Sequence, residues 1–549
     1  MRIRSSKSIR LMILSPFLLA IIAWWLYTQV FQPQPIYVNA DPEIPYLMSS
    51  LAVFKGEPYT FIDHPGTPVE IIGTLIFSAT YPFVGNSVNS FTLSHILHPE
   101  IFLFIARALL TLASMGTMVL LGWYMVPGNH WTDHLSAVAI AVLFFGIHPG
   151  AFDSIVHWSH NSFSFPVGSL LGLGMVLLVV EKNVGTKQQK AILGFSFGIL
   201  MAIQLYFVTW IVGAVVAFYA YSVLSMRGWK KALVSSLSIT LAAIAGFIVA
   251  TFPILNKYPD FISWIVRVAS HQGRHGSGPP GFLSLQSAAI NFHSLWSDLR
   301  LLFVSVGVVV VLIAVMALLQ RHSLKSNTGL WAIALGLIAQ ISVMSALVIK
   351  HPSIIYMQAV AATFPLLLAV AIYLMGISIP KMTSTQRLIK FGLSLGIFIL
   401  FSIAVFRAFF IHSIEIKQVQ YAVEETNDFL DELALDQGRE QQSLNKLWVY
   451  GMPSECQALW YGNHYAGYTL SVEVGLICPR DLVFDLWENR VVLSDGSSVQ
   501  LDRFDWDIIV AAEAALIDFP DLAEVGRLVY SDARLGTFGK VVYILPSHD

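Results

Sequence analysis

The chain has little charge for its length. Only 12% of its 549 residues are charged and 56% are hydrophobic, whereas about 25% charge is usual in soluble domains. A soluble domain of this size could not bury that much apolar surface. Repeated apolar runs of roughly 20 residues therefore predict an α-helical polytopic membrane protein.

Two other features are missing. The chain has no basic tract and no nucleic-acid motif, and its net charge of -2 gives no reason to expect a nucleic-acid partner. No small-residue cleavage site follows the first apolar run, "LMILSPFLLAIIAWWLYTQVF", which is also too long for a signal peptide. Together with the basic "MRIRSSKSIR" before it, this run predicts an uncleaved first helix with a cytoplasmic N-terminus.

Cysteine is almost absent. Cys456 and Cys478 are the two in the chain, and both lie in the polar C-terminal part. A disulfide is one interpretation if that part faces an oxidising compartment, and two small buried thiols are the other.

Hydropathy predicts about 11 transmembrane helices. Short loops rich in Lys and Arg then fall on one side, which the positive-inside rule assigns to the cytoplasm. This side bias requires two helices, joined by a very short turn, in the apolar stretch from 191 to 226. The predicted spans are 11–31, 101–126, 135–150, 162–180, 191–206, 208–226, 232–253, 299–319, 328–348, 354–378 and 390–410.

Three connections fall on the outer side of the plasma (inner) membrane. They are the first outer loop 32–100, the loop 254–298 and the short "KHPSIIY". Within the first loop, "VEIIGTLIFSATYPFVG" is apolar but short for a span, so we expect an interfacial helix.

The composition changes near residue 412. A charged helical stretch leads into strand-like runs, "KLWVYG", "DLVFDLW", "WDIIVAA" and "KVVYILP". This alternation predicts a membrane module at 1–411 and a small extracytoplasmic α/β domain at 412–549.

The first outer loop carries acids directly after the first helix. Asp41 precedes a predicted short helix that Pro42 begins, so it is suited to cap that helix. A carboxylate held at a helix start is also positioned for chemistry. Glu43 together with Asp41 could bind a divalent metal, although this pairing is common in proteins.

Several features in order resemble the GT-C superfamily of membrane glycosyltransferases, such as protein O-mannosyltransferases and aminoarabinose transferases. An acid outside the first helix is followed by a short helix and "DHPGTP" (63–68). Arg107 then opens a helix, the next helix ends at His148 and Pro149, and "KHPSIIYMQAVAATFPLLL" comes later. The likeness covers about residues 10–410. It implies transfer of a sugar from a polyprenyl-phosphate donor to a lipid, glycan or protein acceptor on the outer membrane face.

The resemblance assigns roles that the residues can fulfil. Asp41 would be the general base that deprotonates the acceptor hydroxyl, and the in-line displacement by that oxygen would invert the anomeric centre. Basic groups would stabilise the leaving phosphate; the candidates are Arg267, Arg274, His275, Lys350 and His64. The alternatives are that Arg267 and Lys350 extend to lipid headgroups, that "GRHGSGPPG" is a flexible linker, and that His64 belongs to a turn.

The supporting residues are Glu43, Asp63, Arg107, His160 and Asn161. Arg107 lies in an apolar helix and should face the protein interior, where an acid of the first loop could pair with it. In "SHNS", His160 or Asn161 stands where the family often has an acid. A metal site of His148, His157 and His160 fits no defined ligand spacing.

Two other classes of protein remain open. A transporter or lipid-linked-sugar flippase would also have many spans, but the chain has no clear internal repeat and its ionisable residues gather at the outer face. A receptor or assembly factor would account for the C-terminal domain and leave the first loop unexplained. Aromatic residues in "YGMPSECQALWYGNHYAGYTLSVEVGLICPRD" could stack on a sugar acceptor, or belong to the domain's core.

Overall fold

The fold is taken from a computed structural model. It describes residues 2–38, 40–62, 66–85, 87–126, 128, 130–180, 186–226, 228–271, 280–281, 285–319, 327–350, 352–378, 384–440, 444–449, 455–478, 481–485, 490–492, 497–499, 506–512, 526–534 and 540–546.

The chain forms two compact units. Unit 1 comprises Met1–Trp25, Ile62–Pro68 and Arg107–Ala408. Unit 2 comprises Leu26–Phe61, Val69–Ala106 and Phe409–Asp549. Unit 2 therefore combines most of the first outer loop with the C-terminal region.

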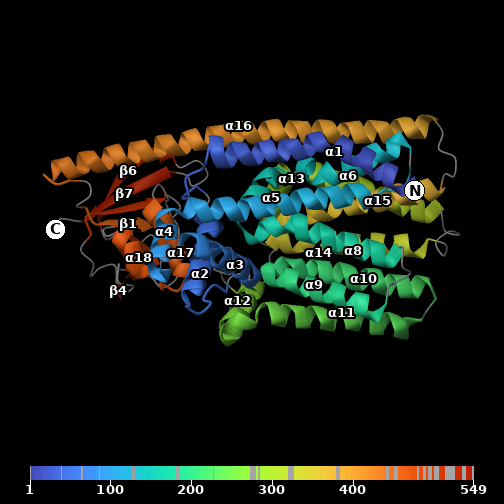
Figure 1. The fold of residues 1–549 in the computed structure, drawn as a ribbon, viewed down its shortest axis with the longest axis horizontal. Coiled ribbons are helices and arrows are strands. Elements are labelled where there is room, and N and C mark those ends of the chain that lie inside the picture. Colours follow the sequence, from blue (N-terminus) through green and yellow to red (C-terminus); the bar gives the residue numbers. More distant parts are fainter. Residues whose placement is uncertain are drawn as a thin grey trace. The chain divides into compact units, whose positions relative to one another are not determined.

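Unit 1 is helical in its described residues. Its longer helices run side by side in Figure 1; α10 packs against α9, α11 and α14, and α9 packs on α11. The helices are α1 (Arg2–Leu26), α6 (Trp131–Ile147), α7 (Ala151–Val156), α8 (Ser169–Val180), α9 (Lys187–Ile203), α10 (Val208–Leu224), α11 (Trp229–Ala250), α12 (Tyr258–Ser270), α13 (Leu285–Leu319), α14 (Thr328–Lys350) and α15 (Gln358–Ser378). The unit boundaries fall inside or at the ends of α1, α3 (Thr67–Val84), α5 (Pro99–Tyr124) and α16 (Ser384–Asp436), and between Phe61 and Ile62.

Ten helical segments of the described chain are long and apolar enough to cross a bilayer, so the predicted multi-pass membrane fold is confirmed. They are Lys7–Phe31, Thr67–Val84, Pro99–Tyr124, His160–Val180, Leu205–Leu224, Trp229–Ala250, Leu285–Leu319, Thr328–Lys350, Ile355–Met375 and Arg387–Asp436.

The set of ten differs from the predicted eleven at three places. The predicted spans 135–150 and 191–206 form helices of 17 residues each, α6 and α9. Such helices are about 25 Å long, which is short for a span. Conversely, α3 (Thr67–Val84), predicted to be interfacial, has 18 residues and sufficient hydropathy to span.

The predicted break between residues 191 and 226 is confirmed. Gln204 adopts an extended conformation, with φ -154° and ψ 129°, between α9 and the short helix Leu205–Phe207 that leads into α10. Glycines then let α9 pack closely on α11, because a Cβ at Gly198 or Gly246 would collide with the backbone of the partner helix. Small residues at such contacts are typical of helix packing in membranes.

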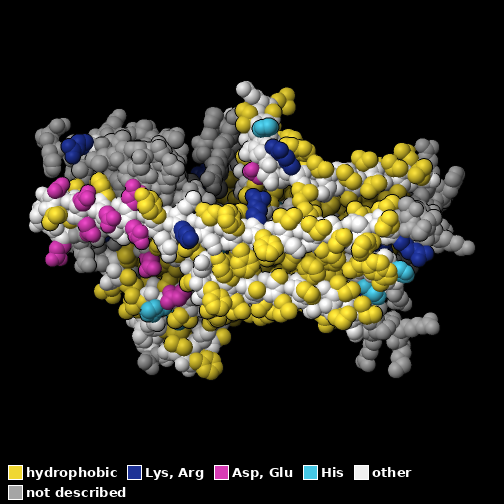
Figure 2. Space-filling model, turned by 90° about the horizontal axis from the view of Figure 1, so that it is seen from above, with side chains coloured by type: hydrophobic (Ala, Val, Ile, Leu, Met, Phe, Trp, Pro, Cys, Tyr) yellow, Lys and Arg dark blue, Asp and Glu magenta, His cyan; other side chains and the backbone are white. Residues whose placement is uncertain are grey.

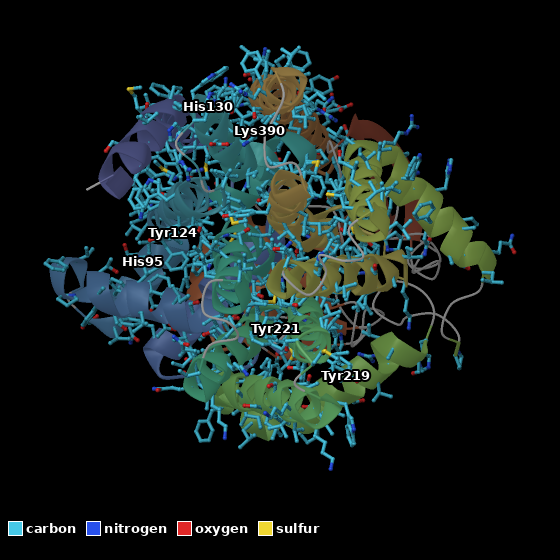
Figure 3. All side chains as sticks on the ribbon, turned by 90° about the vertical axis from the view of Figure 1, so that its right-hand side faces the viewer. His95, Tyr124, His130, Tyr219, Tyr221 and Lys390 are labelled. Carbon is cyan, nitrogen blue, oxygen red and sulfur yellow. A yellow bond between two sulfur atoms is a disulfide. The ribbon has the colours of Figure 1, made fainter. Side chains whose placement is uncertain are left out.

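At one end of unit 1, the side chains of Lys7, Arg10 and Lys390 contact neighbouring residues (Figure 3, where Tyr124, His130 and Lys390 are labelled). Lys390 forms an ion pair with Asp133. The Lys7 ammonium lies 4.5 Å from the centre of the Tyr124 ring. Arg10 is buried and donates to His134 Nδ1 at 3.2 Å. This is the end that the charge bias predicts to be cytoplasmic.

Unit 2 contains a seven-stranded sheet with the order β4-β3-β2-β1-β5-β7-β6. Its central strand β1 pairs in parallel with β2 and β5, and the other pairings are antiparallel. The strands are β1 (Lys446–Val449), β2 (Asp481–Asp485), β3 (Arg490–Val492), β4 (Ser498–Val499), β5 (Ile508–Ala512), β6 (Gly526–Arg534) and β7 (Lys540–Pro546). The predicted mixed α/β architecture of the C-terminal region is confirmed, while the domain bounds 1–411 and 412–549 stay predictions.

Helices of unit 2 come from both ends of the chain. They are α2 (Ala40–Lys55), α3, α4 (Val88–Leu97), α17 (Glu455–Tyr465) and α18 (Ser471–Ile477). A disulfide joins Cys456 to Cys478, so the disulfide interpretation holds. The last turns of α16 expose acids such as Glu424, Asp428 and Asp431, and Figure 2 shows acidic side chains gathered over that end of the helix.

Candidate functional site

In unit 2, the predicted catalytic acid lies in a helix. Asp41 lies in the first turn of α2, which begins at Ala40 and not at Pro42, so Asp41 does not precede the helix as predicted; its side chain is outside the described residues. Glu43, two residues later, is buried with 2% of its surface exposed. Asp63 and His64 of the "DHPGTP" motif lie outside the described residues.

The helices α2 and α3 pack closely through small and polar groups. A Cβ at Gly73 would collide with the Ser50 side chain, and Thr74 donates to the Ser50 carbonyl at 3.1 Å. One turn earlier on α3, Glu70 is completely buried. Within the described part of the chain, neither of its carboxyl oxygens has a partner with good hydrogen-bond geometry, and the Ser49 hydroxyl is the nearby polar group that interacts with it.

Sequence analysis missed Glu70, although its signal was present. It is the one acid in the apolar stretch "VEIIGTLIFSATYPFVG" and it follows the "DHPGTP" motif directly. The Glu70 carboxyl interacts electrostatically with Tyr59. Burial raises the pKa of Tyr59, and the Glu70 carboxyl raises that pKa further. A buried carboxyl without well-formed hydrogen bonds is costly, so Glu70 is an unusual feature of this helix pair.

The C-terminal region packs directly on α2. At Gly462 of α17, a Cβ would lie 2.6 Å from Ile44 and 2.7 Å from Met48. At the other end of α2, Lys55 pairs with Glu473 of α18 at 2.5 Å. The helix that carries Asp41 is therefore held by two helices of the C-terminal domain, which the sequence did not predict.

In unit 1, the predicted cations gather near the ends of α12 and α14. Lys350, the last residue of α14, is buried and its ammonium donates to the Ala269 carbonyl near the end of α12. Arg267 lies in the last turn of α12 and is exposed. Both residues lie in the last turns of their helices, whereas Arg274 and His275 lie outside the described residues.

A neutral histidine ties the end of α6 to the segment after α14. The Gly150 amide donates to Nδ1 of His148 at 3.2 Å, so Nε2 carries the proton and donates to the Ile354 carbonyl at 2.9 Å. Burial lowers the pKa of His148 to about 4, and the bond to Ile354 offsets part of that effect. A histidine with such a low pKa is uncharged near pH 7, so it is suited to a structural role.

The "SHNS" segment meets the break before α10. Asn161 is buried and its Oδ1 accepts from Nε2 of Gln204 at 2.7 Å. Two residues after Gln204, the Tyr206 ring lies 4.6 Å from that of Tyr356. His160 is also buried. We call His148, Asn161, Gln204, Tyr206, Lys350 and Tyr356 the polar cluster.

The polar cluster lies at the end of unit 1 opposite the basic contacts of Arg10 and Lys390. His148 follows the last residue of α6, whereas Asp133, the partner of Lys390, is in the first turn of that helix. Arg107, in α5, is buried as its apolar surroundings predict, with 8% of its surface exposed. Thr111 donates to both the Arg107 and Ile155 carbonyls, which connects α5 to α7.

A metal site has no support among the described residues. No group of three or more His, Cys, Asp or Glu side chains is arranged there to hold an ion. The triple of His148, His157 and His160 is therefore not brought together as a ligand set, and the pair of Asp41 and Glu43 stays a prediction because the Asp41 side chain is outside the described residues.

Comparison with known proteins finds one kind of likeness. No family model and no curated protein matches the chain. Among solved structures, the chain is similar to ArnT from Cupriavidus metallidurans bound to undecaprenyl phosphate. The identity is 11%, the match covers 97% of this chain and 99% of that one, and the TM-score is 0.44.

Proposed function

We propose that this protein transfers a sugar from a polyprenyl-phosphate carrier to an acceptor hydroxyl. The observation that carries the proposal is the buried ammonium of Lys350 at the very end of a membrane-spanning helix. A cation at the end of such a helix is suited to a phosphate whose polyprenyl tail lies in the membrane. Arg267, on the neighbouring helix end, would add a second donor for the same phosphate.

In the proposed reaction, the acceptor oxygen attacks the anomeric carbon of the donor sugar. The new bond forms from the acceptor oxygen to that carbon, and the bond from the carbon to the phosphate oxygen breaks. The acceptor proton goes to the Asp41 carboxylate, and the electron pair leaves on the phosphate. Lys350 stabilises the charge that develops on the phosphate. A single displacement of this kind inverts the anomeric centre.

The positions of the charged residues support a transporter less well than a glycosyltransferase. The predicted cations Lys350 and Arg267 lie in the last turns of their helices, and Asp41 lies in the first turn of its own. Transporters place their substrate and ion sites near the middle of the membrane, at broken helices. Chemistry at the membrane surface agrees better with charges at helix ends.

The test is donor consumption by the purified full-length chain in lipid nanodiscs. A panel of synthetic polyprenyl-phosphate hexoses and pentoses is offered with lipid, glycan and protein acceptors. Released polyprenyl phosphate reports transfer to any acceptor, water included. We expect release from at least one donor and an inverted anomeric configuration in the product. No release from any donor, combined with movement of lipid-linked sugars across vesicles, would contradict the proposal.

A further inference from the structure

The C-terminal domain carries a cluster of partly exposed rings beside the first outer loop, within unit 2. We call Tyr461, His464, Tyr465 and Tyr468 the aromatic platform; all four are partly exposed. The rings of Tyr461 and Tyr465 are 5.3 Å apart, and those of His464 and Tyr465 are 5.1 Å apart. His464 and Tyr468 follow at 5.4 Å.

The platform rests on a buried aromatic base. Phe61 is 5% exposed and lies 4.8 Å from Tyr465 in an edge-to-face arrangement. Tyr46 of α2, fully buried, lies 5.0 Å from Phe61. Buried rings below and partly exposed rings above distinguish the platform from an ordinary aromatic core, whose rings would all be covered.

The backbone under the platform is held in an unusual conformation. Tyr468 has φ +60°, in the left-handed region that bulky residues rarely adopt, and it follows Gly467 at φ +65°. Glycine could occupy both positions without strain, so the tyrosine at 468 has a cost. Strained residues of this kind gather at binding and catalytic sites, where the side chain must be presented in one direction.

Surrounding hydrogen bonds hold that conformation in place. The buried Asn463 accepts from the Tyr468 amide on its carbonyl at 2.8 Å, and its side chain bonds Ser471 and the Leu470 amide, each at 3.1 Å. Nδ1 of His464 and the Tyr468 hydroxyl are 2.8 Å apart. The ring of Tyr468 is thus fixed in position before any ligand arrives, which lowers the entropic cost of binding.

The platform also borders the loop that leads to the "DHPGTP" motif. Thr60 donates to the Tyr465 carbonyl at 2.7 Å, and a Cβ at Gly467 would lie 2.8 Å from Thr60. Residue 60 is three positions before Asp63. The same domain contacts α2 through Gly462, so it holds the first loop at two places between Glu43 and Asp63.

We propose that the aromatic platform binds the acceptor as a neutral pyranose ring. This inference rests on the proposed function and names the acceptor's class. Tyrosine and histidine rings offer a flat apolar face to the carbon–hydrogen face of a sugar, and their hydroxyl and nitrogen groups serve its hydroxyls. All four platform side chains are uncharged or weakly basic, so the surface fits a neutral sugar better than a phosphorylated one.

The test is saturation-transfer NMR on the full-length protein in nanodiscs without donor. The probes are the methyl glycosides of glucose, galactose, mannose and N-acetylglucosamine. We expect transfer to one face of at least one of these rings. Tyr468→Gly is the decisive variant, because glycine suits φ +60° and deletes only the ring. It should lose most of the signal without any fall in the thermal unfolding midpoint.

Matched variants complete the experiment. Tyr465→Ala should also lose the signal, while Tyr421→Ala, at a tyrosine of α16 that is 64% exposed, should keep it. The proposal would be overturned if none of the four glycosides gave a signal with the wild type. It would also be overturned if Tyr468→Gly and Tyr465→Ala both gave the same signal as the wild type. Because no donor is present, this failure is distinct from a failure of sugar transfer, which Asp41→Asn tests separately.

Discussion

The buried side chains of Lys350 and His148 in unit 1 differ in hydrogen bonding from that of Glu70 in unit 2. In unit 1, Lys350 donates to the Ala269 carbonyl, and both ring nitrogens of His148 are hydrogen-bonded. In unit 2, the completely buried Glu70 has no hydrogen bond of good geometry from any described residue. A ligand phosphate must therefore compete with Ala269 for Lys350, whereas a polar group that reached Glu70 would displace no described hydrogen bond of good geometry. Lys350 is thus a hydrogen-bonded buried cation, whereas Glu70 is a buried acid without a hydrogen bond of good geometry from the described residues.

Lys350→Ala is the variant with the largest expected effect on this comparison. It removes the buried cation that we propose stabilises the leaving phosphate, so kcat/KM for the polyprenyl-phosphate donor should fall about 10²-fold. Release of polyprenyl phosphate measures the rate. Lys350→Arg keeps the charge and should retain most of the activity. If Lys350→Ala transferred sugar at the wild-type rate, the ammonium would serve only to anchor α12.

Acidification should weaken unit 1 through His148. The pKa of this histidine is lowered to about 4 in the folded protein from an ordinary value of 6.5. The folded state therefore keeps His148 neutral, and its stability is complete above pH 6.5 and is lost as the pH falls toward 4. The loss should reach about 3 kcal/mol. Thermal unfolding midpoints between pH 7 and pH 4 measure it.

The control for the acid effect is His148→Gln. Glutamine can still bond Ile354 but cannot take up a proton, so this variant should lose stability less steeply between pH 6.5 and pH 4. An identical pH profile in the wild type and His148→Gln would show that another group causes the acid sensitivity.

Glu70→Met should stabilise the protein, in contrast to most substitutions of buried residues. Methionine has a similar length, and it removes a carboxyl that no described residue bonds with good geometry. The gain should be about 1–3 kcal/mol, seen as a higher unfolding midpoint. Glu70→Gln keeps a polar group in the same place and should gain less.

Gln204→Met in unit 1 is the control for Glu70→Met, and it should lower the unfolding midpoint. It leaves the buried Asn161 oxygen without its 2.7 Å bond, so it should cost about 1–3 kcal/mol. The two methionine variants should thus move the midpoint in opposite directions. A fall of similar size in both would mean that Glu70 has a stabilising partner and that the buried side chains do not differ in this way.

Local patterns predicted much of the fold. Long apolar runs and basic loops were enough for the helical membrane module, and even the break at Gln204 followed from the charge bias of the loops. The strands β1, β2, β5 and β7 were predicted because each is a short apolar run. The strands β3, β4 and β6 were missed, since they are shorter or carry polar residues that no periodicity distinguishes from loops.

The candidate site was harder to predict because it depends on contacts between distant segments. The packing of α17 on α2 at Gly462 and the bond from Lys350 to Ala269 join residues far apart in the sequence. Glu70 was visible as an acid in an apolar run, but its lack of a well-formed hydrogen bond from the described residues is a property of the folded packing. The roles of Asp41 and of the basic residues stay predictions.

The most direct measurement is sugar transfer by Asp41→Asn in the purified full-length protein. Asparagine keeps the shape of the side chain, but it cannot accept the acceptor proton. We predict a loss of about 10²–10⁴-fold in transfer with unchanged donor binding, while Glu57→Gln, at another acid of the first loop, stays active. Transfer by Asp41→Asn at the wild-type rate would contradict the assignment of Asp41 as the catalytic base.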